Sequence, residues 1–232
     1  MDRARKFAYA TLVVSVAVVA HIIPAASQTR DQNWARCEDN NPDLSIGGCT
    51  AVIQAGGETD ENLASAFFNR GLAYRRQGQN DLAIANYNEA IRLKPDDADA
   101  FVNRGYAYIG KGQYALAIAD DNEAIRLKPD NADAFANRGS VYFGKGQYDL
   151  AIMDYDKALS IRPDAIDFFN RGNAYCGKSQ YDLANADYNE AIRLKPDFAD
   201  AFYNRGGAKQ KLGDVAGGAA DIAQAKALGY TP

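Results

Sequence analysis

The chain has 232 residues, of which 26 are basic and 30 acidic, so its net charge is −4. An acidic chain without a basic cluster is poorly suited to the phosphate backbone, and nucleic-acid binding is not expected. The single histidine, His21, lies near the N-terminus. Histidine-dependent catalytic sites and histidine-ligated metal sites are therefore not expected in the rest of the chain, and we predict no enzyme activity, metal or cofactor.

Residues 1–27 have the order of a secretory signal peptide. Three basic residues precede an apolar run over residues 7–23, and small residues follow Pro24. Cleavage is predicted near Ser27, which removes three basic residues and one acidic residue and leaves a net charge of −6. The alternative is an uncleaved anchor, because the run is nearly long enough to cross a bilayer. The predicted location of the cleaved chain is the bacterial periplasm, outside the membrane.

Residues 28–63 are predicted to form a degenerate helical cap. The pattern of residues 43–53 returns at residues 81–91, and residues 34–37 resemble the remnant of a preceding helix. Cys37 and Cys49 lie in this segment, and export would place them in an oxidising compartment. We predict a Cys37–Cys49 disulfide, worth about 3 kcal/mol on the loop-entropy scale. The alternative is two buried thiols, and Cys176 is predicted to be a packed thiol.

The rest of the chain repeats one motif five times: an aromatic residue, any residue, then Asn-Arg-Gly. The arginines are spaced by 34, 34, 33 and 34 residues, a period typical of a helical solenoid. The second copy predicts a helix over residues 98–111 ended by Gly112, and another over residues 114–128 ended by Pro129. The sequence of residues 88–96 recurs unchanged at 122–130 and 189–197.

These recurring positions resemble the tetratricopeptide repeat family. The copies share the same kinds of residue in the same order: a bulky residue, a glycine, a tyrosine, two alanines around an aromatic residue, and a closing proline. In the first copy they are Phe67, Gly71, Tyr74, Ala83, Tyr87, Ala90 and Pro95. The resemblance covers about residues 64–230. It departs from the pattern at Asp121, at the junction of the third and fourth copies, which is one residue short, and in the fifth copy, which is interpreted as a terminal cap.

The resemblance implies an all-α solenoid, in which antiparallel helix pairs form a right-handed superhelix. Five repeats are predicted, at about residues 64–97, 98–131, 132–164, 165–198 and 199–232.

Each motif arginine is followed sixteen residues later by a residue with a side-chain oxygen, and four of the five are aspartates. Antiparallel helices can bring such residues together, and ion pairs of this kind fix register more than they add stability. Aligned arginines that bind an anionic partner are the alternative. The predicted pairs are Arg104–Asp120, Arg138–Asp154, Arg171–Asp187 and Arg205–Asp221.

Acidic residues also recur where the first helix of each repeat begins, as in residues 96–99 and 130–133. Acids at helix starts accept free backbone N–H groups and complement the helix dipole, so capping is the predicted role. Acid–base catalysis and weak divalent-cation binding are the alternatives, although the spacing is not that of an EF-hand loop.

The motif asparagines are the predicted ligand contacts. In the tetratricopeptide repeat family the first helices line the concave face, and asparagine at this position contacts peptide backbones in some members. An amide can both donate to and accept from a peptide unit, although a structural role is the alternative. The predicted groove residues are the asparagines Asn69, Asn103, Asn137, Asn170 and Asn204 and the aromatics Phe68, Tyr106, Phe143, Phe169 and Tyr203.

The groove is expected to be aromatic with an acidic edge, and the basic residues of the family's carboxylate clamp are largely missing. The implied function is non-catalytic interaction: binding of an extended or helical segment of a protein or peptide partner. The alternative is a structural component of a cell-envelope complex that acts through its convex face, its ends or self-association. An accessory subunit of an enzyme is a further alternative.

Overall fold

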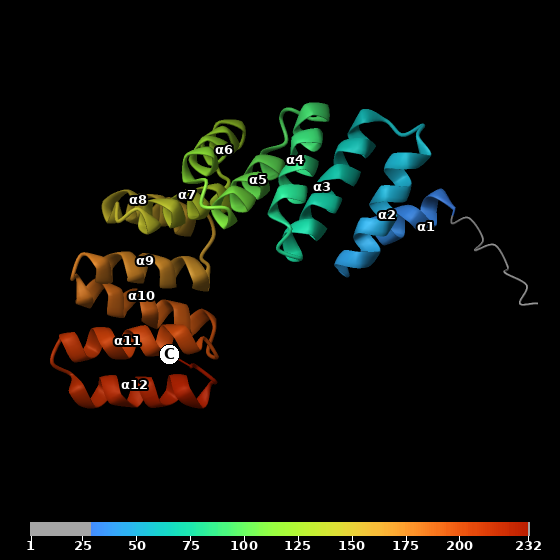
Figure 1. Cartoon of the computed structure of the whole chain (residues 1–232). Coiled ribbons are helices and arrows are strands. Elements are labelled where there is room, and N and C mark those ends of the chain that lie inside the picture. Colours follow the sequence, from blue (N-terminus) through green and yellow to red (C-terminus); the bar gives the residue numbers. More distant parts are fainter. Residues whose placement is uncertain (1–28, 232) are drawn as a thin grey trace, which may run out of the picture.

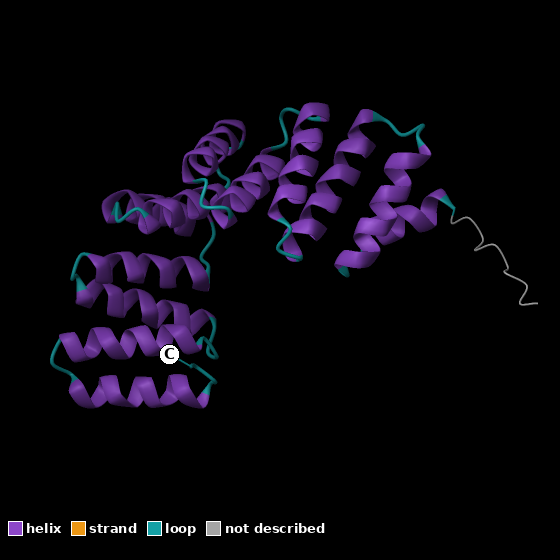
Figure 2. Cartoon of the chain, in the orientation of Figure 1, coloured by secondary structure: helices purple, strands orange, loops and turns teal. Residues whose placement is uncertain are grey.

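The regular structure of residues 29–231, described by a computed structural model, is helical throughout, and no strand occurs in this range (Figure 2). The predicted signal segment lies outside these residues. No helix within residues 29–231 is long and apolar enough to cross a membrane. In chain order the helices are α1 (Arg30–Cys37), α2 (Pro42–Ala55), α3 (Asp60–Arg76), α4 (Asn80–Leu93), α5 (Ala98–Gly110), α6 (Tyr114–Leu127), α7 (Ala132–Gly144), α8 (Tyr148–Ile161), α9 (Ala165–Gly177), α10 (Tyr181–Leu194), α11 (Ala199–Lys211) and α12 (Val215–Ala227).

The helices form pairs that follow one another along an arc, from α1 and α2 at one end to α11 and α12 at the other (Figure 1). Each odd-numbered helix contacts the next odd-numbered helix, whereas no even-numbered helix of the described chain contacts another even-numbered helix. The odd-numbered helices are therefore the inner layer of the arc and the even-numbered helices the outer layer. This is the all-α solenoid predicted from the sequence.

Local sequence sets the ends of these helices. The side chain of Asp97 accepts hydrogen bonds from two backbone N–H groups at the start of α5, and Asn131 and Asp164 cap α7 and α9. Between the helices of a pair the chain turns through a residue with positive φ, which is Ser179 in the fourth repeat. Glycine adopts this conformation without steric cost, so Ser179 is strained. The other repeats have Gly78, Gly112, Gly146 and Gly213 in that turn.

A glycine of the inner helix and a tyrosine of the outer helix hold the regular pairs together. Tyr87 is fully buried against Gly71, where an added Cβ would lie 2.7 Å from the Tyr87 ring. A larger residue would displace the ring from a closely packed interior, so this position needs glycine. The same contact recurs at Gly139–Tyr155 and Gly172–Tyr188.

The second repeat has a carboxylate where the others have this tyrosine. Asp121 is 0% exposed, and neither of its side-chain oxygens has a hydrogen-bond partner among the described residues. Burial raises the pKa of Asp121 to about 8, although the amide of Asn137 favours the charged form. Near neutral pH the native state therefore keeps a proton that the unfolded chain releases.

The arginine of each Asn-Arg-Gly motif joins three helices. Arg138 in α7 donates from Nε and Nη2 to the carboxylate oxygens of Asp154 in α8, at 2.8 and 2.7 Å. Its Nη1 donates to Oδ1 of Asn122 in α6, at 2.5 Å. The guanidinium carbon also lies 5.6 Å from the centre of the Phe135 ring, within cation–π range. One side chain thus fixes its own pair and the preceding pair together.

The other repeats use the same arrangement. All four predicted ion pairs are formed, with 2.7 Å between the closest atoms: Arg104–Asp120, Arg138–Asp154, Arg171–Asp187 and Arg205–Asp221. In the first repeat the motif arginine has neutral partners: Arg70 donates to Asn86 in α4 and to Thr50 in α2. Sequence reasoning missed the contact with the preceding pair, which Asn88, Asn122, Asp156 and Asn189 accept.

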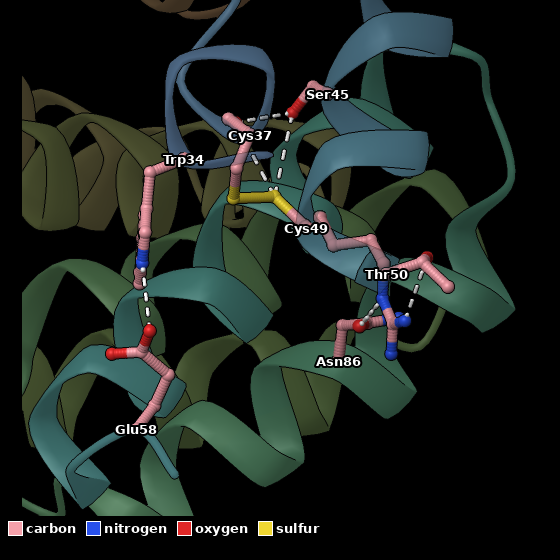
Figure 3. The surroundings of a disulfide bond; sticks show 8 residues. Trp34, Cys37, Ser45, Cys49, Thr50, Glu58 and Asn86 are labelled. Carbon is pink, nitrogen blue, oxygen red and sulfur yellow. Dashed lines mark hydrogen bonds between the residues drawn. A yellow bond between two sulfur atoms is a disulfide. The ribbon is translucent and has the colours of Figure 1, made fainter. Parts of the chain in front are cut away.

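The pair α1–α2 caps the first full repeat and contains the predicted disulfide. Cys37 at the end of α1 and Cys49 in α2 are bonded and buried, as Figure 3 shows. The hydroxyl of Ser45 donates to the carbonyl oxygen of Cys37 at 2.8 Å, so a second contact joins the two helices. The cross-link stabilises a pair whose core is otherwise small.

Glu58 attaches α1 to the loop before α3. Its carboxylate accepts hydrogen bonds from Arg30 at 2.6 and 2.8 Å, from Asn62 at 2.7 Å and from Trp34 at 3.2 Å. The hydrogen bonds from Arg30, Asn62 and Trp34 hold the pKa of Glu58 at about 2. These contacts order the segment that ends the predicted cap.

Helix α3 begins at Asp60, one turn before residue 64, the predicted start of the first repeat, so the helix extends into the segment assigned to the cap. Thr59 caps the helix by accepting from the backbone N–H of Asn62 at 3.2 Å. The prediction was aligned on the Asn-Arg-Gly motif, and the extra turn has no counterpart in the other repeats.

We predict that Arg138→Ala lowers the free energy of unfolding by about 3 kcal/mol, because Asp154 is left buried without its partner. Arg92→Ala is the matched control: Arg92 pairs with Glu89 on the surface, and its loss should change stability little. Urea unfolding followed by circular dichroism measures both. Equal stability of Arg138→Ala and Arg92→Ala would contradict the structural role of the ladder.

We also predict that the free energy of unfolding falls as the pH rises from about 6 to about 8, by up to about 1.4 kcal/mol per pH unit. Below the raised folded pKa of Asp121 the unfolded chain is ionised while the native state keeps its proton, so stability falls as the pH rises and levels off above that pKa. Asp121→Asn should flatten this dependence. Urea unfolding across the range measures it, and parallel curves for the two proteins would show that Asp121 does not titrate there.

Candidate functional site on the concave face

The five predicted asparagines lie in register on the inner helices, but their hydrogen bonds differ. Nδ2 of Asn103 donates to the carbonyl oxygen of Asp99 at 2.8 Å. Nδ2 of Asn137 donates to the carbonyl oxygen of Val102 on the neighbouring inner helix, at 3.3 Å. Nδ2 of Asn204 donates to Oδ1 of Asn173 at 2.8 Å.

Two further asparagines, Asn69 and Asn170, make no side-chain hydrogen bond with another described residue and are half-buried. Asn137 is buried, and its amide holds two neighbouring inner helices together. The amide of Asn204 likewise bonds to the neighbouring inner helix. Asn69, Asn103 and Asn170 are thus the three predicted asparagines that make no side-chain hydrogen bond to another repeat of the described chain.

Two of the predicted groove aromatics pack within the fold. The ring of Phe68 lies 5.9 Å from that of Tyr87, in the core of the first repeat. The ring of Phe169 lies 5.9 Å from Tyr188 and 4.9 Å from Phe198, between the fourth and fifth repeats. Phe68 and Phe169 are half-buried, and their rings fill space between helices, so they are less available to a ligand than the exposed aromatics.

The other three are accessible from the inner face. Tyr106 is 51% exposed and Phe143 is 36% exposed. Tyr203 is half-buried and stacks on Tyr230, with 4.2 Å between ring centres, so the segment after α12 folds back onto α11. Exposed aromatics on a concave surface are available for a ligand.

A hollow of about 490 Å³, here termed the aromatic pocket, lies among the third, fourth and fifth repeats. Beneath it, the Tyr188 hydroxyl and the Asn204 amide both donate to Oδ1 of Asn173, each at 2.8 Å. Cys176 also lines it, and burial raises the pKa of that thiol. Its main walls are Phe143, Tyr148, Tyr181, Tyr188, Tyr203 and Asn204.

Tyr148 and Tyr181 were not among the predicted site residues. Each is the first residue of an outer helix, α8 or α10, and Tyr114 begins α6 in the same way. The recurrence of a tyrosine at this position was the sequence signal that could have assigned them.

A second hollow, of about 340 Å³, lies among the second, third and fourth repeats and is here termed the acidic pocket. Arg162 forms an ion pair with Asp133, and Asp164 caps α9. Burial raises the pKa of Asp167 to about 6, with the Asp164 carboxylate adding to the shift and Arg162 opposing it. The charged and polar residues lining this pocket are Arg75, Asn103, Asp133, Asn137, Arg162, Asp164 and Asp167, beside Tyr106.

The acidic residues of the described chain do not converge as metal ligands. No group of three or more His, Cys, Asp or Glu side chains within residues 29–231 is placed to hold a metal ion. Several of the acids instead cap helices or pair with arginine.

The family of this chain follows from its match to the sequence patterns of known protein families. The pattern of the TPR repeat matches residues 71–112, 105–146 and 172–213, and that of the tetratricopeptide repeat matches residues 132–165. The chain belongs to the tetratricopeptide repeat family. No curated protein matches the sequence as a whole.

Solved tetratricopeptide repeat structures share the fold. MamA from Desulfovibrio magneticus RS-1 is 22% identical, with a TM-score of 0.64 over 71% of this chain and 94% of that one. YrrB, described as a TPR protein with an unusual peptide-binding site, is 23% identical, with a TM-score of 0.60 over 79% and 93%. PilF from Pseudomonas aeruginosa is 17% identical, with a TM-score of 0.70 over 75% and 79%. At these identities the likeness supports the fold alone.

Proposed function

We propose that this tetratricopeptide repeat protein binds an extended or helical segment of a partner protein on its concave face, without catalysis. The observation that carries this proposal is the pair of hollows on the inner helices, each with an exposed aromatic ring beside it. Tyr106 lines the acidic pocket and Phe143 lines the aromatic pocket. Burying such rings further is favourable: Tyr106 contacts Arg75 and Phe143 contacts Tyr148, but both rings keep an exposed part.

The free amides supply a way to hold a segment regardless of its sequence. The side-chain oxygens of Asn69, Asn103 and Asn170 have no partner in the described chain, and each can accept from a peptide N–H. They occupy the same position on α3, α5 and α9, the inner helices of the first, second and fourth repeats, and this spacing allows contact with separate parts of one extended segment. YrrB, which shares the fold, is described as having a peptide-binding site, and this supports the same use of the surface here.

The setting we propose is the bacterial periplasm. The Cys37–Cys49 disulfide lies in the cap, and disulfides persist in oxidising compartments. The signal-like order of residues 1–27 supports the same location.

A second candidate function is assembly through the outer face. Four outer helices each expose a leucine at the same position, with exposed fractions between 42% and 47%. A row of exposed leucines can be buried against another protein surface or a second copy. The leucines are Leu82, Leu116, Leu150 and Leu183.

For the groove, we predict that Asn69→Ala, Asn103→Ala and Asn170→Ala combined leave the protein folded but abolish capture of its partner from a cell-envelope extract. The side-chain oxygens of these residues support no helix contact, so stability should change little. Capture on immobilised protein, with mass spectrometry of the bound fraction, measures the loss. The matched control is Leu116→Ser with Leu150→Ser on the outer face, which should capture the same partner as the wild type. Loss in the control alone would move binding to the outer face.

For the second candidate, we predict that the molar mass of the wild type rises with protein concentration. The double variant Leu116→Glu with Leu150→Glu should keep the monomer mass. The introduced charges would have to be desolvated in an assembled outer face. Sedimentation velocity measures the mass. A monomeric wild type at every concentration would reject self-association through these leucines.

A further inference from the structure

The inner helix of the fourth repeat begins with a different sequence from its counterparts. Helices α5, α7 and α11 begin Ala-Asp-Ala-Phe, whereas α9 begins Ala-Ile-Asp-Phe. When the repeats are aligned on Asn-Arg-Gly, Asp167 therefore stands where the other repeats have alanine. Those alanines are all fully buried: Ala66, Ala100, Ala134 and Ala201.

Asp167 is an unsatisfied carboxylate. It is 5% exposed, and it forms neither a hydrogen bond nor an ion pair through its side chain with another residue of the described range. It lines the acidic pocket. Burying a carboxylate without a partner is costly, so this substitution in a repeat that otherwise uses alanine needs a compensating cation.

The neighbouring acids do not share this state. Asp133 is paired with Arg162, and Asp164 accepts backbone N–H groups at the start of α9. Asp167 is thus the acid in this pocket whose carboxylate has neither a hydrogen bond nor an ion pair in the described chain, and the more distant charge of Arg162 favours its ionised form.

The rest of the pocket suits a long basic side chain. Tyr106 presents an exposed aromatic ring, which attracts a guanidinium or ammonium group, and Asn103 has a side-chain oxygen free to accept from it. The volume of about 340 Å³ is small for a ligand pocket and suits one side chain rather than a folded partner.

Arg75 also lines this pocket, so a bound cation would share the pocket with a basic side chain of the protein. Its guanidinium carbon lies 5.1 Å from the centre of the Tyr106 ring, and its Nε is buried with no hydrogen-bond partner among the described residues. Arg75 therefore occupies one side of the Tyr106 ring, and its buried Nε is not accessible to a ligand. The group that the pocket offers to a further cation is the carboxylate of Asp167.

We propose that the acidic pocket binds an arginine or lysine side chain of the partner segment, with Asp167 as its carboxylate partner. This inference rests on the proposed function of the concave face and names the chemistry of one ligand residue.

The test is selection of peptides from a displayed library of random heptapeptides by four proteins. These are the wild type, Asp167→Ala, Asp200→Ala and the combined Asn69→Ala, Asn103→Ala and Asn170→Ala variant. Asp167→Ala restores the alanine of the other repeats and should fold, and Asp200→Ala removes an exposed acid from the first turn of α11 as a matched control. The wild type and Asp200→Ala should enrich arginine or lysine at one peptide position, and Asp167→Ala should lose that preference.

Two other outcomes are distinguishable. Peptides without a basic preference that still require Asn69, Asn103 and Asn170 would overturn the cation site and leave the proposed function standing. No enrichment that depends on these asparagines would overturn both.

The selected peptide then gives a quantitative test. Replacing its basic residue with neutral citrulline or norleucine should weaken binding to the wild type by about 10- to 100-fold, the range for a charged hydrogen bond. The same replacement should change binding to Asp167→Ala little. Equal losses in both proteins, measured by fluorescence anisotropy, would place the basic residue elsewhere and overturn the proposal.

Discussion

The contact on which the rest of this structure depends is that of the motif arginine with two outer helices. In the second to fifth repeats, two nitrogens of the guanidinium donate to a carboxylate on the outer helix of the same pair. The third nitrogen donates to a side-chain oxygen on the outer helix of the preceding pair. A planar group with five donors can do this, whereas lysine could not maintain the same geometry. Because the contact recurs in each repeat, it fixes the register within pairs and the stacking between them.

The same contact determines which residues face the inner surface of the arc. The residue before each arginine is rotated by about 100° around the helix, so when the arginine points towards the outer helices the asparagine lies towards the inner face. Asn69, Asn103 and Asn170 are therefore presented by the element that holds the repeats together. A binding surface built in this way is rigid, which lowers the entropic cost of ordering it around a segment.

Departures from the repeat concentrate around the acidic pocket. Asp121 replaces a packed tyrosine, Asp167 replaces a packed alanine, and the third and fourth repeats are joined by one residue fewer. Each of the two aspartates is a buried acid with a raised pKa, and burial is the main cause in both. A regular repeat avoids such groups because they are costly, and of these two aspartates Asp167 is the one that lines the acidic pocket.

The sequence by itself determined the fold class, the repeat period and the four ion pairs, because each depends on residues at a constant separation in antiparallel helices. It indicated the disulfide for a different reason: two cysteines lie in one short segment that follows a signal-like N-terminus. It did not reveal that Phe68 and Phe169 pack between helices while Tyr106 and Phe143 stay exposed, since all four are aromatic residues on inner helices. It also did not separate the asparagines that bond within the fold from those that do not. Only the tertiary structure decided these points, because whether a side chain is buried or free depends on how neighbouring repeats close against it.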